Sequence, residues 1–275
     1  MDGPPAGSVD AAEPGSLLWF GPHPDDEYYL APLLGRFCVD WGWTCTFVVA
    51  TRGEGGSCGL AGGCYPDLAT VRAEEMKASA ALFGATLEHW NLGDDGAYQP
   101  YPGDVEKVVS DWAAKEGGLD ALLARVTETI ESVAPDVIYA MDWRHGCYCH
   151  PQHRAFGAVV ARAVRDIGPD APPLKMLAGS AEQLATGFGF RPVVPSDPAL
   201  EAFDATTHLP SIDGEAWLYL VEVLRTHRSQ FDLTDAEIAY IKSGPDELKR
   251  IYTVPFDAVV EDDPGYADLC APSTF

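Results

Sequence analysis

The residues best suited to chemistry follow a short apolar run near the start of the chain. Leu17 to Phe20 (LLWF) predicts a buried strand, and the next residues, GPHPDDE, contain His23, Asp25 and Asp26. Imidazole and carboxylate groups are good ligands for zinc and similar divalent ions. A further carboxylate beside such a site can accept a proton from an attacking water. Capping of a helix that begins near Glu27 is the alternative role for these aspartates.

A second polar cluster follows another apolar segment in the middle of the chain. Residues 136–142 (DVIYAMD) predict a buried strand, which leads into WRHGCYCHPQH with His150 and His153. The C-terminal ends of parallel strands meet at one edge of a sheet, where open α/β folds bind their ligands. His23, Asp26 and one histidine of the second cluster would therefore form a three-ligand site with a position open for water.

The cysteines allow another interpretation of the second cluster. Cys147 and Cys149 spell C-x-C-H-x-x-H with the two histidines, although structural zinc sites usually use cysteine pairs about two to four residues apart. The chain has seven cysteines, and without an export signal most are expected to be reduced thiols. Cys58 and Cys64 flank a glycine-rich stretch and could form a local bridge. Three others are expected to be small core residues: Cys38, Cys45 and Cys270.

Length and charge limit the class of protein. The chain has 275 residues, 47% of them hydrophobic, which is enough for one large α/β domain. Its net charge of −24 argues against nucleic acid or a membrane surface as a partner and favours a neutral or cationic small molecule. A solvated acidic surface is the alternative meaning of that charge. No apolar run approaches the roughly 20 residues of a membrane span. Residues 1–15 lack the features of a signal peptide, so we expect a disordered leader and a cytoplasmic protein.

The predicted elements alternate between strands and helices. Strands are expected at 17–20, 44–50, 87–90, 136–142 and 174–177, and helices at 28–39, 68–83, 119–133, 156–167 and 214–230. This order predicts a Rossmann-like, mostly parallel sheet flanked by helices. The segment 104–118 fits neither pattern clearly. Residues 16–275 are expected to form one domain, in which an extension from about residue 171 walls the pocket.

These motifs resemble the LmbE/PIG-L family of metal-dependent de-N-acetylases. The family signature (A/P)-H-P-D-D-E is matched by residues 22–27, and H-P-D-H is matched by 150–153 except that Gln152 replaces the usual Asp. Weaker family-like features lie at 51–54 (TRGE), 72–75 (RAEE), 82–84 (LFG), 92–96 (LGDDG) and 227–230 (HRSQ). The resemblance runs from about residue 17 to residue 230.

The resemblance implies a role for each matched residue. It implies metal ligation by His23, Asp26 and His153, with zinc as the metal and iron(II) as an alternative. It implies that Asp25 is the general base, and that His150 and Tyr148 contact the tetrahedral intermediate or the scissile carbonyl. The family's Asp at position 152 tunes the neighbouring histidine, whereas Gln152 carries no charge. His150 is therefore expected to be less easily protonated here.

Four further residues are expected to bind substrate: Arg52, Arg72, Asp95 and His227. Ion pairs with Glu54 and Glu75 are the alternative role for the two arginines. The sequence Asp94-Asp95-Gly96 also fits a turn, and His227 also fits a buried structural histidine.

The sequence thus predicts a zinc-dependent hydrolase that removes an acetyl group from an N-acetylglucosamine-type sugar, such as one carried on a natural-product glycoside in antibiotic biosynthesis. Two alternatives remain open. The chain could be an amidase for a larger acyl or peptide-like amide, or a metal- and sugar-binding protein without turnover, which the exchange at Gln152 would favour.

Overall fold

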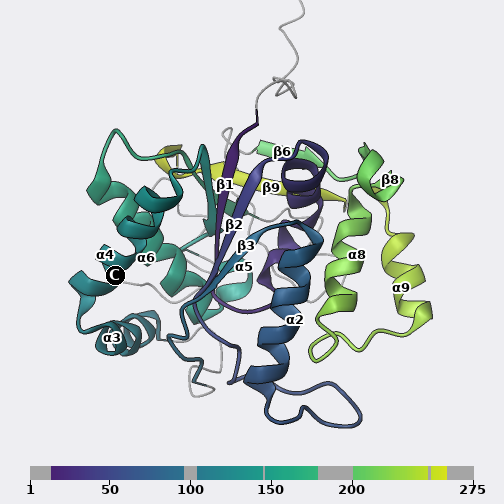
Figure 1. Ribbon diagram of the computed structural model, residues 1–275, viewed down its shortest axis with the longest axis horizontal. Helices are drawn as coiled ribbons and strands as arrows, with labels where there is room; N and C mark the ends of the chain where they lie inside the picture. Colours follow the sequence, from purple (N-terminus) through teal and green to yellow (C-terminus); the bar gives the residue numbers. More distant parts are fainter. Residues whose placement is uncertain (1–13, 96–103, 145, 179–200, 247–248, 259–275) are drawn as a thin grey trace, which may run out of the picture.

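The computed structural model describes residues 14–95, 104–144, 146–178, 201–246 and 249–258 (Figure 1). Nearly all of the expected leader, and Cys270, lie outside these ranges. Within these ranges, the main sheet has seven strands in the order β3-β2-β1-β4-β5-β9-β6. Their bounds are β1 Ser16–Gly21, β2 Thr44–Val49, β3 Thr86–His89, β4 Val137–Met141, β5 Leu174–Ala178, β6 Glu201–Asp204 and β9 Arg250–Pro255.

The sheet is mostly parallel. Strands β1 to β5 pair in parallel, whereas β9 pairs antiparallel with both β5 and β6. The expected parallel sheet is therefore confirmed, and the C-terminal part of the chain extends one edge with antiparallel strands. Two short strands, β7 (His208–Leu209) and β8 (Gly214–Glu215), form a separate antiparallel pair.

Helices cover both faces of the sheet (Figure 1). The alternation of side chains along β1 divides the core, because Leu17 and Trp19 pack with one set of helices and Leu18 and Phe20 with the other. One face carries α3 (Val105–Glu116), α4 (Leu119–Val133) and α6 (Pro151–Ile167). The other carries α1 (Ala31–Leu34), α2 (Leu68–Leu82), α8 (Trp217–Thr226) and α9 (Asp235–Lys242). In the described ranges, no helix has the length and apolar character needed to cross a membrane.

The first predicted helix differs most from the structure. Instead of one helix over 28–39, the chain forms a 3-10 turn (Asp26–Tyr29), then α1, then a π-helical turn (Gly35–Asp40). Pro32 explains the division, because it has no backbone N–H and is tolerated only in the first turn of a helix. The segment 104–118, which the pattern left undecided, forms α3 behind an Asp104 side chain that accepts a hydrogen bond from the Lys107 N–H.

The expectation of mostly reduced cysteines was wrong. Cys38 and Cys45 form a disulfide, as do Cys58 and Cys64, and Cys149 is also disulfide-bonded. Cys147 is a buried free thiol. The local bridge weighed for Cys58 and Cys64 is confirmed. Cys38 and Cys45 are core residues, as expected, but they are bonded to each other. Disulfides are rare in cytosolic proteins, and cytoplasmic localisation stays a prediction that these bonds do not favour.

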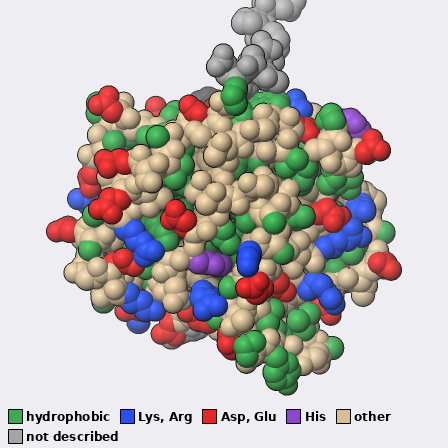
Figure 2. Space-filling view, in the orientation of Figure 1, with side chains coloured by type: hydrophobic (Ala, Val, Ile, Leu, Met, Phe, Trp, Pro, Cys, Tyr) green, Lys and Arg blue, Asp and Glu red, His purple; other side chains and the backbone are tan. Residues whose placement is uncertain are grey.

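The acidic net charge is not gathered into one patch on the face that Figure 2 shows. Acidic and basic side chains are interspersed there with apolar ones. On this face the charge distribution is that of a solvated surface.

Candidate active site

The two polar motifs meet because β1 and β4 are neighbouring parallel strands. Leu17 lies opposite Val137 in their register, so the turns that follow Gly21 and Met141 leave the same edge of the sheet. The strand order runs one way from β1 to β2 and β3 and the other way from β1 to β4 and β5. A crevice at such a reversal is where open α/β sheets bind ligands, and the prediction that the motifs share one edge is confirmed.

Three buried imidazoles form a cluster at this edge. His23 follows β1, His150 caps the N-terminus of α6, and His153 lies in its first turn. Their nitrogens that are available to a metal all lie within 4.8 Å of one another. Asp26 joins the cluster: its two carboxylate oxygens lie 3.1 Å from His23 Nδ1 and 3.2 Å from His153 Nε2. We call these four residues the histidine cluster.

The histidine cluster fits a divalent metal ion. Its donors are imidazole nitrogens and carboxylate oxygens, the set that zinc and iron(II) accept. Nδ1 of His153 lies 3.1 Å from the carbonyl oxygen of Gly146. A metal-binding histidine usually donates its other ring N–H to such an acceptor, which fixes its tautomer and its orientation. The structure thus brings the predicted ligands His23, Asp26 and His153 together and adds His150 as a further donor.

Charge is shared unequally in the cluster. Burial works to lower the pKa of His23, but the charge of Asp26 and the hydrogen bond to it outweigh burial and raise that pKa to about 9. Burial would raise the pKa of Asp26, yet His153 and His23 hold it well below its usual value. Burial lowers the pKa of His150 well below its usual value, and the neighbouring imidazoles add to this. Burial also lowers the pKa of His153, so His150 and His153 both favour the neutral form.

The side chain of Gln152 does not contact His150, the neighbour that its position in the motif suggested. Its side-chain oxygen lies 2.8 Å from His23 Nε2, so the carboxamide contacts His23, whereas His150 is contacted by the backbone N–H of Gln152. The amide nitrogen of Gln152 is buried without a hydrogen-bond partner among the described residues. The expected low basicity of His150 agrees with the direction of its pKa, but its causes are burial and the other imidazoles.

Asp25 lies beside the cluster in an unusual backbone conformation. Its φ is 109°, in the region that L-residues rarely adopt, and such a residue persists only where its surroundings hold it. Its side chain caps no helix, so the alternative capping role fails. The carboxylate lies 3.0 Å from Arg72 Nη2. Burial raises the pKa of Asp25 to about 6 against the opposing charge of Arg72.

Arg72 holds the turn around Asp25. It is 4% exposed and donates to the carbonyl oxygens of Gly53, at 3.0 Å, and Pro24, at 2.5 Å. Its ion-pair partner is Asp25 and not Glu75, the partner weighed from the sequence. A substrate-binding role for Arg72 stays a prediction, and its contacts describe a residue that orients Asp25.

The remaining predicted site residues are placed as follows. Arg52 is half-buried, and its backbone N–H donates to Glu54. Asp95 is exposed, in the segment that follows β3. The side chain of Tyr148 lies outside the described part of the structure, although its backbone is in α5 (Gly146–Cys149). Their roles stay predictions.

His227 lies at the C-terminal end of α8 and has no exposed surface. Its Nε2 lies 2.5 Å from Glu27 Oε1. Burial works to lower the pKa of His227, but the charge of Glu27 raises it above its usual value. Sequence reasoning missed Glu27 as a functional residue, although it ends the H-P-D-D-E motif, and it also missed Ser79, which donates to the same Glu27 oxygen.

A family model identifies the relatives of this chain. The model for GlcNAc-PI de-N-acetylase, named PIG-L, matches residues 18–164, which is more than half of the sequence. The chain belongs to the PIG-L family. The matched range includes both motifs of the histidine cluster, Asp25 and Arg72. No curated protein sequence matches the chain significantly.

Solved structures share the fold of this PIG-L family member. N,N'-diacetylchitobiose deacetylase from Pyrococcus horikoshii is 18% identical with a TM-score of 0.57, over 90% of this chain and 88% of that one. The A40926 pseudoaglycone deacetylase Dbv21 is 16% identical with a TM-score of 0.58, over 88% and 97%. GalB, the 4-carboxy-2-hydroxymuconate hydratase from Pseudomonas putida, is 16% identical with a TM-score of 0.55, over 90% and 99%. Because one fold carries deacetylases and a hydratase, the reaction must be argued from the site.

Proposed function

We propose that this PIG-L family protein is a zinc-dependent de-N-acetylase that removes the acetyl group from an N-acetylglucosamine-type sugar. The observation that carries the proposal is the pairing of the histidine cluster with Asp25, a carboxylate whose pKa of about 6 suits a general base near neutral pH. The family model and two of the similar structures carry deacetylase names, which supports amide hydrolysis over hydration.

His23, Asp26 and His153 would hold the metal. A divalent cation bound there would supply Lewis-acid polarisation of the amide carbonyl and a lower pKa for water. The residues of the chain do the rest.

Asp25 accepts a proton from the attacking water and is ionised for this at neutral pH. His150 is neutral because burial lowers its pKa, and it donates one hydrogen bond to the oxygen that gains negative charge. Tyr148 is the other candidate for that contact. The proton held by Asp25 then passes to the amine as the C–N bond breaks, so the products are acetate and the free amino sugar.

The substrate we propose is an acetylated amino sugar on a small glycoconjugate or a natural-product glycoside. The diacetylchitobiose and A40926 pseudoaglycone named for two structural neighbours support this class. The alternative activity for the same site is hydrolysis of an amide that carries a longer acyl group.

The test is an acetate-release assay with the zinc-loaded enzyme on N-acetylglucosamine, diacetylchitobiose and a glycopeptide pseudoaglycone. Matched N-butanoyl and N-octanoyl glucosamines would measure the accepted acyl length. Release of acetate that stops on chelation and returns with zinc is expected. Faster release of the longer acids would replace the proposal with an amidase. Sugar binding with no acid released from any amide would leave a binding protein.

A further inference from the structure

The H-R-S-Q segment at 227–230 packs against one face of α2. Arg72, Glu75 and Ser79 are spaced so that they share this face. Arg72 contacts Asp25, and Ser79 donates to Glu27 Oε1 at 2.5 Å. Glu75 accepts two hydrogen bonds from Ser229, one from its backbone N–H at 2.8 Å and one from its hydroxyl at 2.5 Å. The α2 face therefore joins the turn that carries Asp25 to the segment that follows α8.

Glu27 is the centre of these contacts. It is fully buried, as are Ser79 and His227. Its Oε1 accepts from the Ser79 hydroxyl and from His227 Nε2, each at 2.5 Å, and its Oε2 accepts from the backbone N–H of Asp25 at 3.2 Å. A buried carboxylate needs such donors to offset its lost hydration. The same contacts hold the peptide of Asp25, whose φ of 109° needs support.

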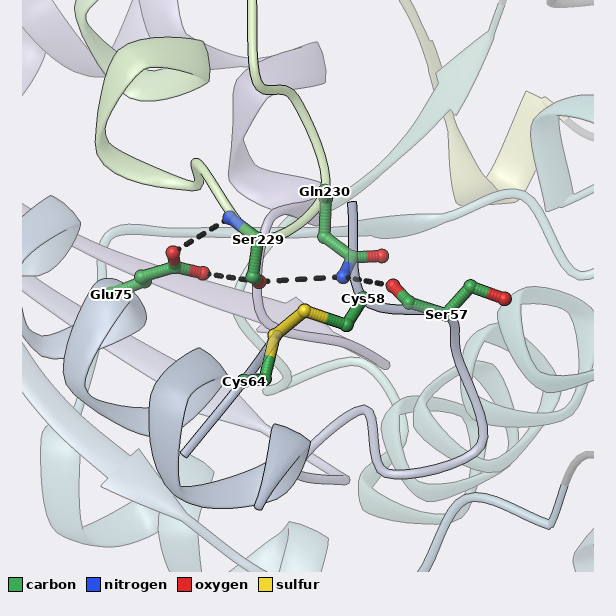
Figure 3. Close-up of a disulfide and its surroundings, with 6 residues drawn as sticks. All are labelled: Ser57, Cys58, Cys64, Glu75, Ser229 and Gln230. Atoms are coloured by element: carbon green, nitrogen blue, oxygen red, sulfur yellow. Dashed lines mark hydrogen bonds between the residues drawn. A yellow bond between two sulfur atoms is a disulfide. The ribbon is translucent and has the colours of Figure 1, made fainter. Parts of the chain in front are cut away.

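The 227–230 segment is itself attached at two further points, and Figure 3 shows the one made by Gln230. Beyond the bonds from Ser229 to Glu75, Gln230 donates to the carbonyl oxygen of Ser57 at 3.0 Å. Ser57 precedes Cys58, whose disulfide with Cys64 closes the neighbouring loop. The backbone N–H of Gly59 also donates to the Ser229 carbonyl, at 2.7 Å. These contacts fix the end of α8, and with it the imidazole of His227.

We propose that His227 and Ser79 are positioning residues that act through Glu27 to hold Asp25 in its left-handed conformation, with its carboxylate directed at Arg72. The inference rests on the proposed role of Asp25 as the general base. It assigns the H-R-S-Q motif to the support of the base, in place of the direct substrate contact expected for His227. Loss of either donor leaves Glu27 buried with fewer partners and allows the Asp25 peptide to turn away.

Kinetics of His227→Ala, His227→Gln and Ser79→Ala, each with its metal content measured, test the proposal. The expected result for His227→Ala is a fall in kcat of about 10–100-fold with KM nearly unchanged, since displacement of a reacting group by about 1 Å can cost on the order of 10²-fold. His227→Gln keeps an N–H donor for Glu27 and should recover part of kcat. Ser79→Ala should show a smaller loss of the same kind.

Val223→Ala is the matched control. Val223 is a fully buried residue of α8, so its truncation lowers stability without removing a donor to Glu27. If Val223→Ala and His227→Ala lower Tm equally but only His227→Ala lowers kcat, His227 acts on the reaction and not merely on stability. Equal kcat losses in both variants would overturn the proposal. Should His227→Ala fail to fold, the kcat and KM of Ser79→Ala decide.

A readout without turnover separates this inference from the proposed function. A crystal structure of His227→Gln and of Ser79→Ala would give the φ of Asp25 and its distance to Arg72. If Asp25 moves in these variants but the wild-type protein releases no acetate, the positioning role stands and the deacetylase proposal is rejected. An unmoved Asp25 and unchanged kcat in an active deacetylase would reject the positioning role alone.

Discussion

The histidine cluster and the support of Asp25 are neighbours that the chain assembles in different ways. The cluster takes its four side chains from two short segments: residues 23–26, which follow β1, and residues 150–153, at the N-terminal end of α6. The residues that hold Asp25 come from three segments: Glu27 from the turn after β1, Arg72 and Ser79 from α2, and His227 from the end of α8. The sequence separation between Glu27 and His227 is 200. The geometry of the candidate ligands thus comes from two local motifs, whereas the position of Asp25, the proposed base, depends on the packing of α2 and α8.

The largest effect is expected where the cluster is broken. His153→Ala should remove nearly all bound metal and reduce acetate release to background, because the remaining donors no longer surround an ion. Metal content by mass spectrometry and acetate release measure the two effects. Cys147→Ala is the matched control, since Cys147 is buried close to the cluster but is not in the ligand set. Metal retained in His153→Ala and lost in Cys147→Ala would instead indicate a cysteine-based site.

Asp25→Asn sharpens the comparison by removing the base and leaving the ligands. We expect full metal content and a kcat lower by about 10²–10⁴-fold, because an amide cannot take the proton from water. Single-turnover acetate release on the metal-loaded variant measures the loss. A kcat within a few-fold of wild type would mean that Asp25 serves only the structure of the turn.

Gly53→Ala acts on the support without touching any cluster residue. Gly53 has a φ of +66°, and a Cβ there would lie 2.2 Å from Arg72 Nη1. Displacement of Arg72 should lower kcat about 10-fold or more, through misplacement of Asp25, with the metal retained. Gly62→Ala is the control, because the φ of Gly62 is not in the left-handed region and a Cβ there would meet nothing within 4 Å. Equal activity in the two variants would show that Arg72 does not position the base.

The smallest effects on activity are expected from two of the disulfides, Cys38–Cys45 at the start of β2 and Cys58–Cys64 in the loop that follows β2. Removing either pair by double Cys→Ala substitution should cost about 2 kcal/mol of stability, because each closes a short loop, and thermal unfolding measures this. Only the Cys58/Cys64 variant should also lose activity, since its loop contacts Ser229 and Gln230. The Cys38–Cys45 bond is at the N-terminal end of β2, away from the strand ends that carry the site. Activity losses of the same size in both variants would contradict this difference.

Some elements could be predicted because their local pattern was sufficient. The amphipathic helix at 119–133 has the bounds of α4, and the strand expected at 174–177 differs from β5 by one residue. The helix expected at 28–39 failed because Pro32 starts a new helix inside it. The pairing of Cys38 with Cys45 was missed because it depends on a π-helical turn lying against the start of β2.

The candidate site divides in the same way. The motifs identified His23, Asp25, Asp26, His150 and His153 as candidates, because each motif lies between a buried strand and the helix that follows it. Nothing in the pattern showed that the side chain of Gln152 contacts His23 across 129 residues and not its neighbour His150. The direction of that side chain is set by the packing of α6 against the turn after β1.

The sequence by itself therefore determined the types of the candidate ligands, the strand–turn–helix context that presents them and membership of the PIG-L family, since these depend on residue chemistry over short spacings. Only the tertiary structure decided which groups hold Asp25 in its conformation. Glu27 accepts hydrogen bonds from Ser79 and His227 because the order of the strands and the packing of α2 and α8 bring the three residues together. Contacts between such distant segments form only when the whole sheet and its helices have assembled.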